Sequence, residues 1–160
     1  MEIRRATNQD MNGINDLLHQ VLMVHHNGRP DLFKPHAKKY TDEELMEIIA
    51  DDQKPIFVAV DEKENVLGYA FCLFQQYINN NILTDIKTLY IDDLCVDENY
   101  RGQHIGAALY HFVLDYAKAN LCKECLTCAA FGYFCRGSKE KCESWEYDEH
   151  AFCRIDHVYE

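Results

Sequence analysis

The segment that most constrains the fold is residues 89–109, which reads as a buried strand, a short polar turn and the start of an amphipathic helix. The helix is predicted because its apolar residues form one continuous face at helical spacing. These residues are Ile105, Ala108, Leu109, Phe112, Val113, Tyr116 and Ala117. The first turn of a helix has unpaired N–H groups and a partial positive charge, so it can bind a phosphate. Arg101 adds a full positive charge, and Gly102 and Gly106 let a ligand approach the backbone.

Apolar periodicity in the rest of the chain predicts an α/β fold. The expected elements are, in chain order, a strand at 3–5, a helix after the cap at 7–10, a loop at 25–35, a helix opened by the capping box at 41–44, strands at 56–60, 66–77 and 86–96, the helix from 104 and a strand at 124–130. A length of 160 residues is usual for one domain with one core. We therefore assign residues 1–160 to a single domain.

The acidic composition limits the classes of partner. A formal net charge of −11 argues against nonspecific binding of nucleic acid, which needs positive side chains against the phosphates. The same charge favours a cationic acceptor such as an alkylamine or a lysine-bearing peptide, although an acidic surface also serves solubility alone. The first residues lack the apolar run of a signal peptide, and no stretch approaches the roughly 20 apolar residues of a membrane span. We expect a cytoplasmic protein without a membrane partner.

The turn before the amphipathic helix resembles a known family signature. Asp-x-Leu-x-Val at 92–96, followed by Tyr-Arg-Gly-x-x-Ile-Gly at 100–106, is similar to the acetyl-coenzyme A signature of GNAT-type N-acetyltransferases. In that family Arg or Gln is followed by two residues, Gly, one residue, and Gly or Ala. Arg101 and Gly106 match, but His104 stands where the family usually has its first glycine. The replacement is tolerable if His104 keeps ordinary helical dihedrals, although its side chain narrows the space beside the pyrophosphate.

The resemblance covers residues 1–128 by order of elements, and it implies a GNAT-like fold of order β-α-α-β-β-β-α-β. Such a fold has a mixed, mainly antiparallel central sheet flanked by helices. The strand before the signature carries a bulge and splays from its neighbour, and the pantetheine arm of acetyl-coenzyme A lies in the gap. On this resemblance acetyl-coenzyme A is the co-substrate, contacted by main-chain groups at 94–96 and by N–H groups at 103–107. The residues assigned to it are Leu94, Cys95, Val96, Arg101, Gly102, Gln103, His104, Ile105, Gly106 and Ala107.

Two adjacent carboxylates, Asp92 and Asp93, interrupt the strand at 86–96. An alkylamine with a pKa near ~10.4 is protonated at neutral pH and cannot attack a thioester until it loses that proton. A carboxylate near the acyl carbon can take the proton, directly or through water. GNAT enzymes often place an acidic residue here, which makes Asp92 the first candidate base and Asp93 the second. Because side chains alternate along a strand, we expect only one of them to face the cleft. The alternative is a strand end with solvated carboxylates.

Residues 129–160 depart from the family, which commonly uses a tyrosine as general acid in its last third, close to a Phe-Tyr pair that this chain lacks. Tyr133 is a candidate for that role by composition alone, and the alternative is an aromatic side chain packed under the sheet. One hypothesis for this divergent tail is a shift of reading frame in the gene. With permitted codons, residues 134–141 read one nucleotide forward can encode Phe-Ala-Glu-Gly-Ala-Arg-Lys. Such a tail would reduce or abolish catalysis.

The cysteines allow a metal hypothesis. Cys122, Cys125 and Cys128 have a spacing found in zinc sites, but no second Cys-x-x-Cys pair follows, and two of the three fall on a predicted strand. Reduced structural thiols, with no bound metal, are the expectation for a cytosolic protein.

A second hypothesis concerns the predicted loop at 25–35. It carries His25, His26 and Arg29, and in GNAT enzymes this loop often borders the acceptor pocket. These three residues are candidates for binding the acceptor, and a solvated loop is the alternative.

The sequence thus predicts an N-acetyltransferase that moves an acetyl group from acetyl-coenzyme A to the primary amine of a small molecule or a peptide. One alternative is a module that binds coenzyme A with little or no catalysis because of the tail. Another is a small cysteine-ligated metal protein. The oligomeric state stays open, since an altered last hairpin could leave a sheet edge that pairs with a second copy as a homodimer.

Overall fold

The structure, a computed structural model of the chain, describes residues 1–127. It contains one five-stranded sheet in the order β1-β2-β3-β4-β5. Its first four strands are antiparallel neighbours, and β5 runs parallel to β4. The strands are β1 Glu2–Arg5, β2 Ile56–Val60, β3 Val66–Gln76, β4 Lys87–Val96 and β5 Glu124–Thr127. The predicted mixed, mainly antiparallel sheet is therefore confirmed.

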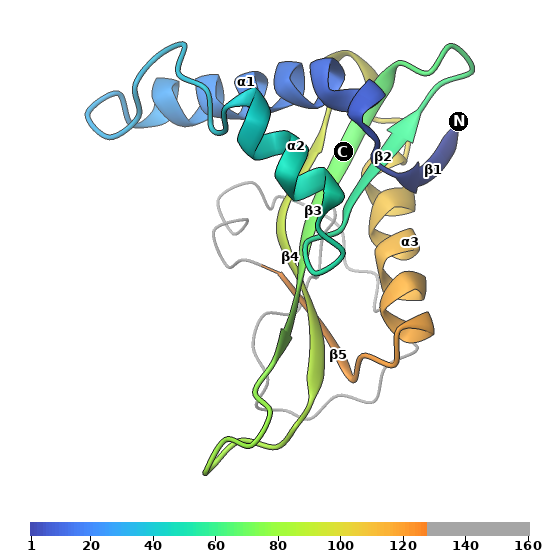
Figure 1. Ribbon diagram of the computed structural model, residues 1–160. Helices are drawn as coiled ribbons and strands as arrows, with labels where there is room; N and C mark the ends of the chain where they lie inside the picture. The colour runs from blue at the N-terminus through green and yellow to red at the C-terminus, as the bar shows by residue number, and fades with distance from the viewer. Residues whose placement is uncertain (128–160) are drawn as a thin grey trace.

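Three α-helices flank this sheet in the described part of the chain (Figure 1). They are α1 Met11–Gly28, α2 Asp42–Ala50 and α3 Ile105–Ala119, with short 3-10 turns η1 Asn8–Asp10 before α1 and η2 Glu98–Tyr100 before α3. The capping box at α2 is formed as predicted: the Glu44 N–H donates to Thr41 Oγ1 at 3.1 Å, and the Thr41 N–H donates to Glu44 Oε2 at 2.8 Å. Helix α2 therefore begins where the sequence places it.

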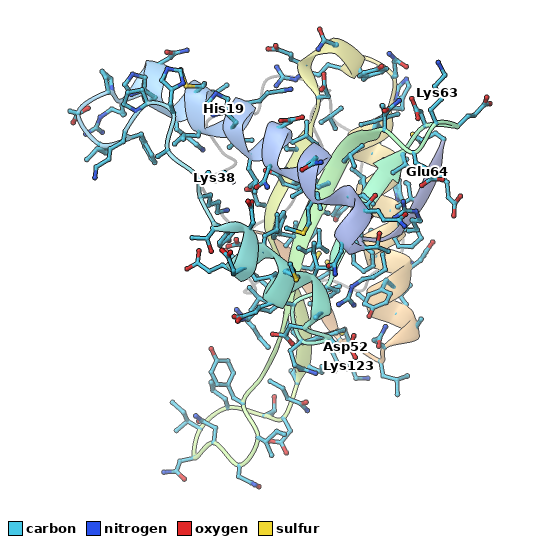
Figure 2. All side chains as sticks on the ribbon, turned by 45° about the horizontal axis from the view of Figure 1, so that its top comes forward. His19, Lys38, Asp52, Lys63, Glu64 and Lys123 are labelled. Atoms are coloured by element: carbon cyan, nitrogen blue, oxygen red, sulfur yellow. The ribbon has the colours of Figure 1, made fainter. Side chains whose placement is uncertain are left out.

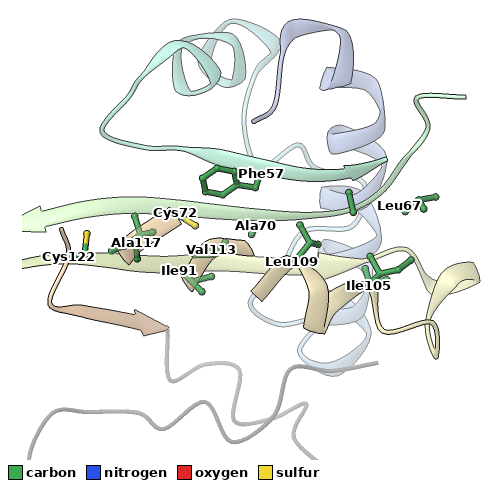
Figure 3. Packing of buried hydrophobic residues seen from close by; sticks show 13 residues of the cluster. Phe57, Leu67, Ala70, Cys72, Ile91, Ile105, Leu109, Val113, Ala117 and Cys122 are labelled. Atoms are coloured by element: carbon green, nitrogen blue, oxygen red, sulfur yellow. The ribbon is translucent and has the colours of Figure 1, made fainter. Parts of the chain in front are cut away.

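The core has two layers because both faces of the sheet are covered. On one face, side chains of α3 such as Leu109, Val113 and Ala117 pack on the sheet (Figure 3). On the other face, α1 and α2 contribute Ile14, Leu17, Leu18, Leu45 and Ile49. All five residues of β2 are buried, which fits a central strand with helices on both sides.

A buried ion pair joins β1 to the turn before α1. Both guanidinium nitrogens of Arg4 donate to the carboxylate of Asp10, at 2.8 and 3.0 Å. The Asp10 side chain is 2% exposed, and its carboxylate also accepts from the N–H and hydroxyl of Thr7. Burial alone raises the pKa of Asp10, but the hydrogen bonds from Arg4 and Thr7 outweigh it and lower the pKa. Asp10 therefore stays charged at neutral pH and anchors the start of α1.

Helix α1 is longer than predicted. The sequence places His25 and His26 on a loop, but both lie in the helix, which ends at Gly28. The physical reason is that no proline interrupts the segment before Pro30, so the helix continues to the next glycine. Arg29 caps the helix through its N–H, which donates to the carbonyl of His25 at 2.8 Å. The placement of the two histidines on a loop is therefore wrong, whereas Arg29 does lie outside the helix.

A β-bulge interrupts the pairing of β3 with β4, as the family resemblance implies. Phe71 pairs with Asp93 and Cys72 pairs with Ile91, which leaves Asp92 as the extra residue of β4. The bulge changes the facing of the strand. Ile91 belongs to the core on the α3 side, whereas Cys95 belongs to the core under α1 and α2. On its other edge, β4 pairs with β5 over Thr88–Ile91, and the splay expected beyond this ladder stays a prediction.

Candidate active site

The first part of the site is the turn that leads into α3. It holds two residues with left-handed backbone, Gly102 at φ 78° and His104 at φ 59° and ψ 18°. His104 is the N-cap of α3 and not a helical residue. The condition stated for tolerating a histidine here, ordinary helical dihedrals, is therefore not met. The chain turns sharply here into the first turn of the helix, and it does so through a residue with left-handed backbone. Glycine adopts this conformation most easily, which accounts for the glycine that the family pattern has at this position.

The start of α3 is seated tightly on the sheet. Ile105 is 3% exposed and packs near Gly68 of β3. A Cβ at Gly68 would lie 2.8 Å from the Cys95 carbonyl oxygen and 3.1 Å from Leu109 Cδ1, so glycine at this position lets α3 approach the two strands. Gly106 is also buried. The helix start is consequently held at the end of β4, next to the predicted pantetheine segment 94–96.

The solvent side of the same turn is open. Residues 101–104 are exposed, and a Cβ built at Gly102 meets no atom within 4 Å. The N–H groups of the first helical turn have no partners within the helix and carry a partial positive charge. Arg101 adds a positive charge to the same turn, and groups of this kind can bind an anion such as a diphosphate. The structure thus brings together the residues predicted to contact the pyrophosphate.

The second part of the site is a cluster of one amine and two carboxylates at the bulge of β4. Lys39 Nζ donates to Asp93 Oδ2 at 3.1 Å and lies 3.8 Å from Asp92 Oδ2. The Tyr69 hydroxyl donates to the same Asp93 oxygen at 3.1 Å. The Asp93 side chain is 13% exposed, against 44% for Asp92. Asp93 is thus the more sheltered carboxylate and the one with two donors.

Strand alternation, the basis for expecting only one of these carboxylates to face the cleft, is interrupted at this point. Both Asp92 and Asp93 contact the same ammonium group. The physical reason is the bulge, because its extra residue breaks the alternation between the two positions.

Aromatic rings surround the Lys39 ammonium. Its Nζ lies 5.4 Å from the ring centre of Tyr40 and 5.8 Å from that of Phe71, within the range of a cation–π contact. The two rings are stacked at 6.0 Å. Burial alone lowers the pKa of Lys39, but the charges of Asp93 and Asp92 and the hydrogen bond to Asp93 outweigh it, so the pKa is raised. The surroundings therefore hold this amine as a cation.

Burial also controls the neighbouring protons. Tyr69 is fully buried, and burial together with the charge of Asp93 raises its pKa well above the ordinary value. Burial and the same charge raise the pKa of Cys95 to about 12. Both groups stay protonated at neutral pH, so Tyr69 is a permanent donor to Asp93 and Cys95 is not a thiolate nucleophile.

The three candidate acceptor residues lie at the far end of α1 and on the loop after it. His25 stacks on Phe33 at 5.1 Å, and His26 Nδ1 lies 2.7 Å from the Phe33 carbonyl oxygen. Arg29 pairs with Asp31 through two hydrogen bonds of 2.8 and 2.9 Å. These contacts hold the loop after α1 against the helix, and a role in acceptor binding stays a prediction.

Sequence reasoning missed Lys39, Tyr40 and Tyr69. Lys39 and Tyr40 lie directly before the capping box of α2. In the sequence, this pair does not differ from an ordinary solvent-exposed segment that leads into a helix. Tyr69 reads as a core residue of a strand. The signal that would have found them is the spatial approach to Asp93, 54 residues away from Lys39 and 24 from Tyr69.

Other predictions concern metals, membranes and the tail. Among residues 1–127, no three side chains of the metal-binding types His, Cys, Asp and Glu come together as a possible metal site. Within the same range, no helix has the length and apolar character needed to cross a bilayer. Cys122 is buried and Cys125 half-buried, and neither forms a disulfide with another described residue. Tyr133, Cys128 and the frame-shift hypothesis for residues 134–141 lie outside the described residues.

Comparison with known proteins gives one family and many similar folds. The family model described as the acetyltransferase (GNAT) family matches residues 21–132. A search of curated proteins found no match. The crystal structure of a tetramutant of the BH1408 protein from Bacillus halodurans is 27% identical to this chain, covers 89% of it and 98% of its own length, and has a TM-score of 0.76.

Two further solved structures share the fold at lower identity. An acetyltransferase from Vibrio fischeri is 20% identical, with a TM-score of 0.65 over 79% of this chain and 94% of its own. Glucosamine-6-phosphate N-acetyltransferase from Arabidopsis thaliana is 23% identical, with a TM-score of 0.59 over 91% of this chain and 97% of its own. The similarities therefore extend over nearly the whole length of these proteins.

Proposed function

The chain belongs to the GNAT acetyltransferase family, and on that premise we propose that it transfers an acetyl group from acetyl-coenzyme A to a primary amine. The acceptor is the amine of a small molecule or of a peptide. An amine acceptor is also named for one protein of similar fold, the glucosamine-6-phosphate N-acetyltransferase. The proposal places the enzyme in the cytoplasm and leaves room for a homodimer.

The observation that supports the proposal is the position of a sheltered carboxylate and an exposed helix start at the two ends of one short segment. Asp93 lies on β4 directly before residues 94–96, and the start of α3 follows η2. A coenzyme A thioester is a long molecule with a diphosphate in its middle and an acyl group at its end. Binding the diphosphate at residues 101–107 and pantetheine along 94–96 would bring the acyl end toward Asp93.

The residues of the chain would act in sequence on the acceptor. Asp93 takes a proton from the acceptor ammonium, which frees the nitrogen lone pair to attack the acyl carbon. The Tyr69 hydroxyl holds the Asp93 carboxylate in place through its 3.1 Å hydrogen bond. A backbone N–H near the bulge of β4 stabilises the negative oxygen that forms during the attack. Coenzyme A then leaves as a thiolate and takes up a proton.

Binding and turnover can be tested separately. Calorimetric titration with acetyl-coenzyme A should show binding, and Arg101→Ala should weaken it by about tenfold or more, the usual loss for a hydrogen bond to a charged group. Lys63→Ala is the matched control, because it removes one positive charge from the exposed turn between β2 and β3. If both variants lose the same affinity, the effect is one of overall charge and the site assignment fails.

Turnover is measured by release of the coenzyme A thiol across a panel of primary amines. Asp93→Asn should lower the rate by about 100-fold, the lower range for loss of a general base. Asp92→Asn removes the more exposed neighbour and is expected to have the smaller effect, which compares the two candidate bases directly. Tight binding of acetyl-coenzyme A with no thiol release for any amine would instead establish the alternative, a binding module without catalysis.

A further inference from the structure

The protein holds one of its own primary amines against its candidate base. Lys39 Nζ lies 3.1 Å from Asp93 Oδ2 and 3.8 Å from Asp92 Oδ2. The rings of Tyr40 and Phe71 flank it at 5.4 and 5.8 Å. Two carboxylates and two aromatic faces are the groups that recognise an alkylammonium ion. Lys39 thus occupies the position that the proposed reaction requires for the acceptor nitrogen.

This contact differs from the other lysine ion pairs of the described residues. Lys38, Lys54 and Lys118 each pair with a carboxylate three or four residues away, on the same local segment. Lys39 instead reaches from the α1–α2 connection to β4, a separation of 54 residues. Its side chain is 40% exposed, and ion pairs with this much solvent contact contribute little to stability. Stabilisation alone therefore gives a weak account of an amine placed at this carboxylate.

We propose that Lys39 is an internal acceptor, acetylated on its Nζ by acetyl-coenzyme A bound to the same chain. This inference rests on the proposed function, because it needs the same base and the same acyl donor. It deepens that function by naming the acceptor class as a lysine-like alkylamine with an apolar stem. The ammonium of such an acceptor would lie near the rings of Tyr40 and Phe71, as Lys39 Nζ does.

The reaction balances without any further reagent. The Lys39 ammonium gives one proton to Asp93, which passes it to solvent. The nitrogen lone pair forms a bond to the acyl carbon, and the carbon–sulfur bond breaks with its electron pair on sulfur. The second proton lost by nitrogen ends on the coenzyme A thiolate. The products are Nε-acetyl-Lys39, coenzyme A and one proton.

Acetylation would also change the site. The product amide is neutral, so it loses the ion pairs to Asp92 and Asp93 and leaves Asp93 without its lysine counter-ion. Asp93 would then be able to receive the ammonium of an external acceptor. The self-reaction is therefore expected once per chain.

Lys38 is the matched control within the same molecule. It is the adjacent residue on the segment that leads to α2 (Figure 2), with a side chain 61% exposed and an ion pair to Asp42 at 2.9 Å. Uncatalysed acetylation by a reactive thioester would modify Lys38 at least as readily as Lys39. A preference for Lys39 therefore reports catalysis at Asp93 and not simple exposure.

The test incubates the full chain with acetyl-coenzyme A and follows its intact mass, with fragmentation of peptides to locate the acetyl group. We expect one acetyl group per chain, on Lys39, with a rate about 100-fold above that of Lys38, as for general-base catalysis. The rate per chain should not change with protein concentration. Lys38→Arg should leave the modification unchanged, and Lys39→Arg should abolish it while binding of acetyl-coenzyme A persists.

Three results would overturn the inference. These are equal labelling of Lys38 and Lys39, a rate that rises with protein concentration, and an unmodified Lys39 in a protein that acetylates external amines. In the last case the proposed function stands and only the internal acceptor fails. Absence of both Lys39 labelling and thiol release with any external amine would remove both.

Discussion

Replacing His104 by glycine should stabilise the protein, although it removes a side chain. His104 is a non-glycine residue at φ 59°, a conformation that costs an L-residue about 1–2 kcal/mol. Glycine removes that strain but also gives the unfolded chain more freedom, which costs about 0.5–1 kcal/mol. The His104 side chain is exposed, and the alanine variant described next measures what the loss of its contacts costs. The expected net gain in the free energy of unfolding is about 0.5–1 kcal/mol. For a domain of this size, each kcal/mol raises Tm by roughly 2–4 °C.

The assay is urea unfolding followed by circular dichroism, with two matched variants. His104→Ala keeps a Cβ at the left-handed position, so it should give no gain and separates backbone strain from loss of the imidazole. His111→Gly makes the same replacement at an exposed position in the regular part of α3. It should lose about 1 kcal/mol, the usual effect of glycine inside a helix. If His104→Gly and His104→Ala change stability equally, the backbone argument is refuted.

Three further predictions follow from contacts described above. Gly68→Ala should lower the free energy of unfolding by about 1–3 kcal/mol, because its Cβ would lie 2.8 Å from the Cys95 carbonyl oxygen of β4 and 3.1 Å from Leu109 Cδ1 of α3. An unchanged midpoint in urea unfolding would refute this close packing. Because the folded-state pKa of Asp10 lies below its ordinary 3.8, its ion pair should stabilise the protein above that pH and lose this effect as the pH falls further. Asp10→Asn should therefore lower stability by about 1–2 kcal/mol at pH 7, because Arg4 keeps its ion pair with Glu64, and should flatten the acid limb of a stability–pH curve. A limb as steep as that of the wild type would contradict this. Tyr69→Phe should cost about 1 kcal/mol of stability through loss of its hydrogen bond to Asp93 and should lower thiol release; full activity would show that the hydroxyl does not position Asp93.

The regular elements of this fold were predictable because their signals are local. Strand 56–60 is a short apolar run, and its predicted bounds match β2. The capping box at 41–44 places its two hydrogen-bonding groups within one turn, so its sequence alone predicts the start of α2. The family signature likewise lies within a few residues, which is why the turn before α3 could be placed.

The features that sequence reasoning missed depend on contacts between distant segments. No periodicity marks Asp92 as an extra residue, because a bulge is defined only by the register of the neighbouring strand. The left-handed backbone of His104 follows from how α3 is seated on β3 and β4, and histidine alone does not indicate it. Lys39 meets Asp93 only after α2 has packed on the sheet. Each of these features belongs to the site, where tertiary contacts outweigh local preference.

The extra residue in β4 links the chemistry of this strand to its length. Ile91 and Asp93 are two positions apart, yet one belongs with the core beneath α3 and the other with the lysine near α2. Deleting Asp92 would remove the bulge and place Asp93 directly after Ile91, so regular alternation would keep Asp93 and Cys95 on their present side of the sheet. Odd-numbered residues of β4 therefore face one side of the sheet before Asp92 and the other side after it, and the effect of a substitution must be interpreted accordingly. Loss of Asp92 would thus remove the bulge and one carboxylate of the acid pair together, while the core residues of β4 would keep their facing.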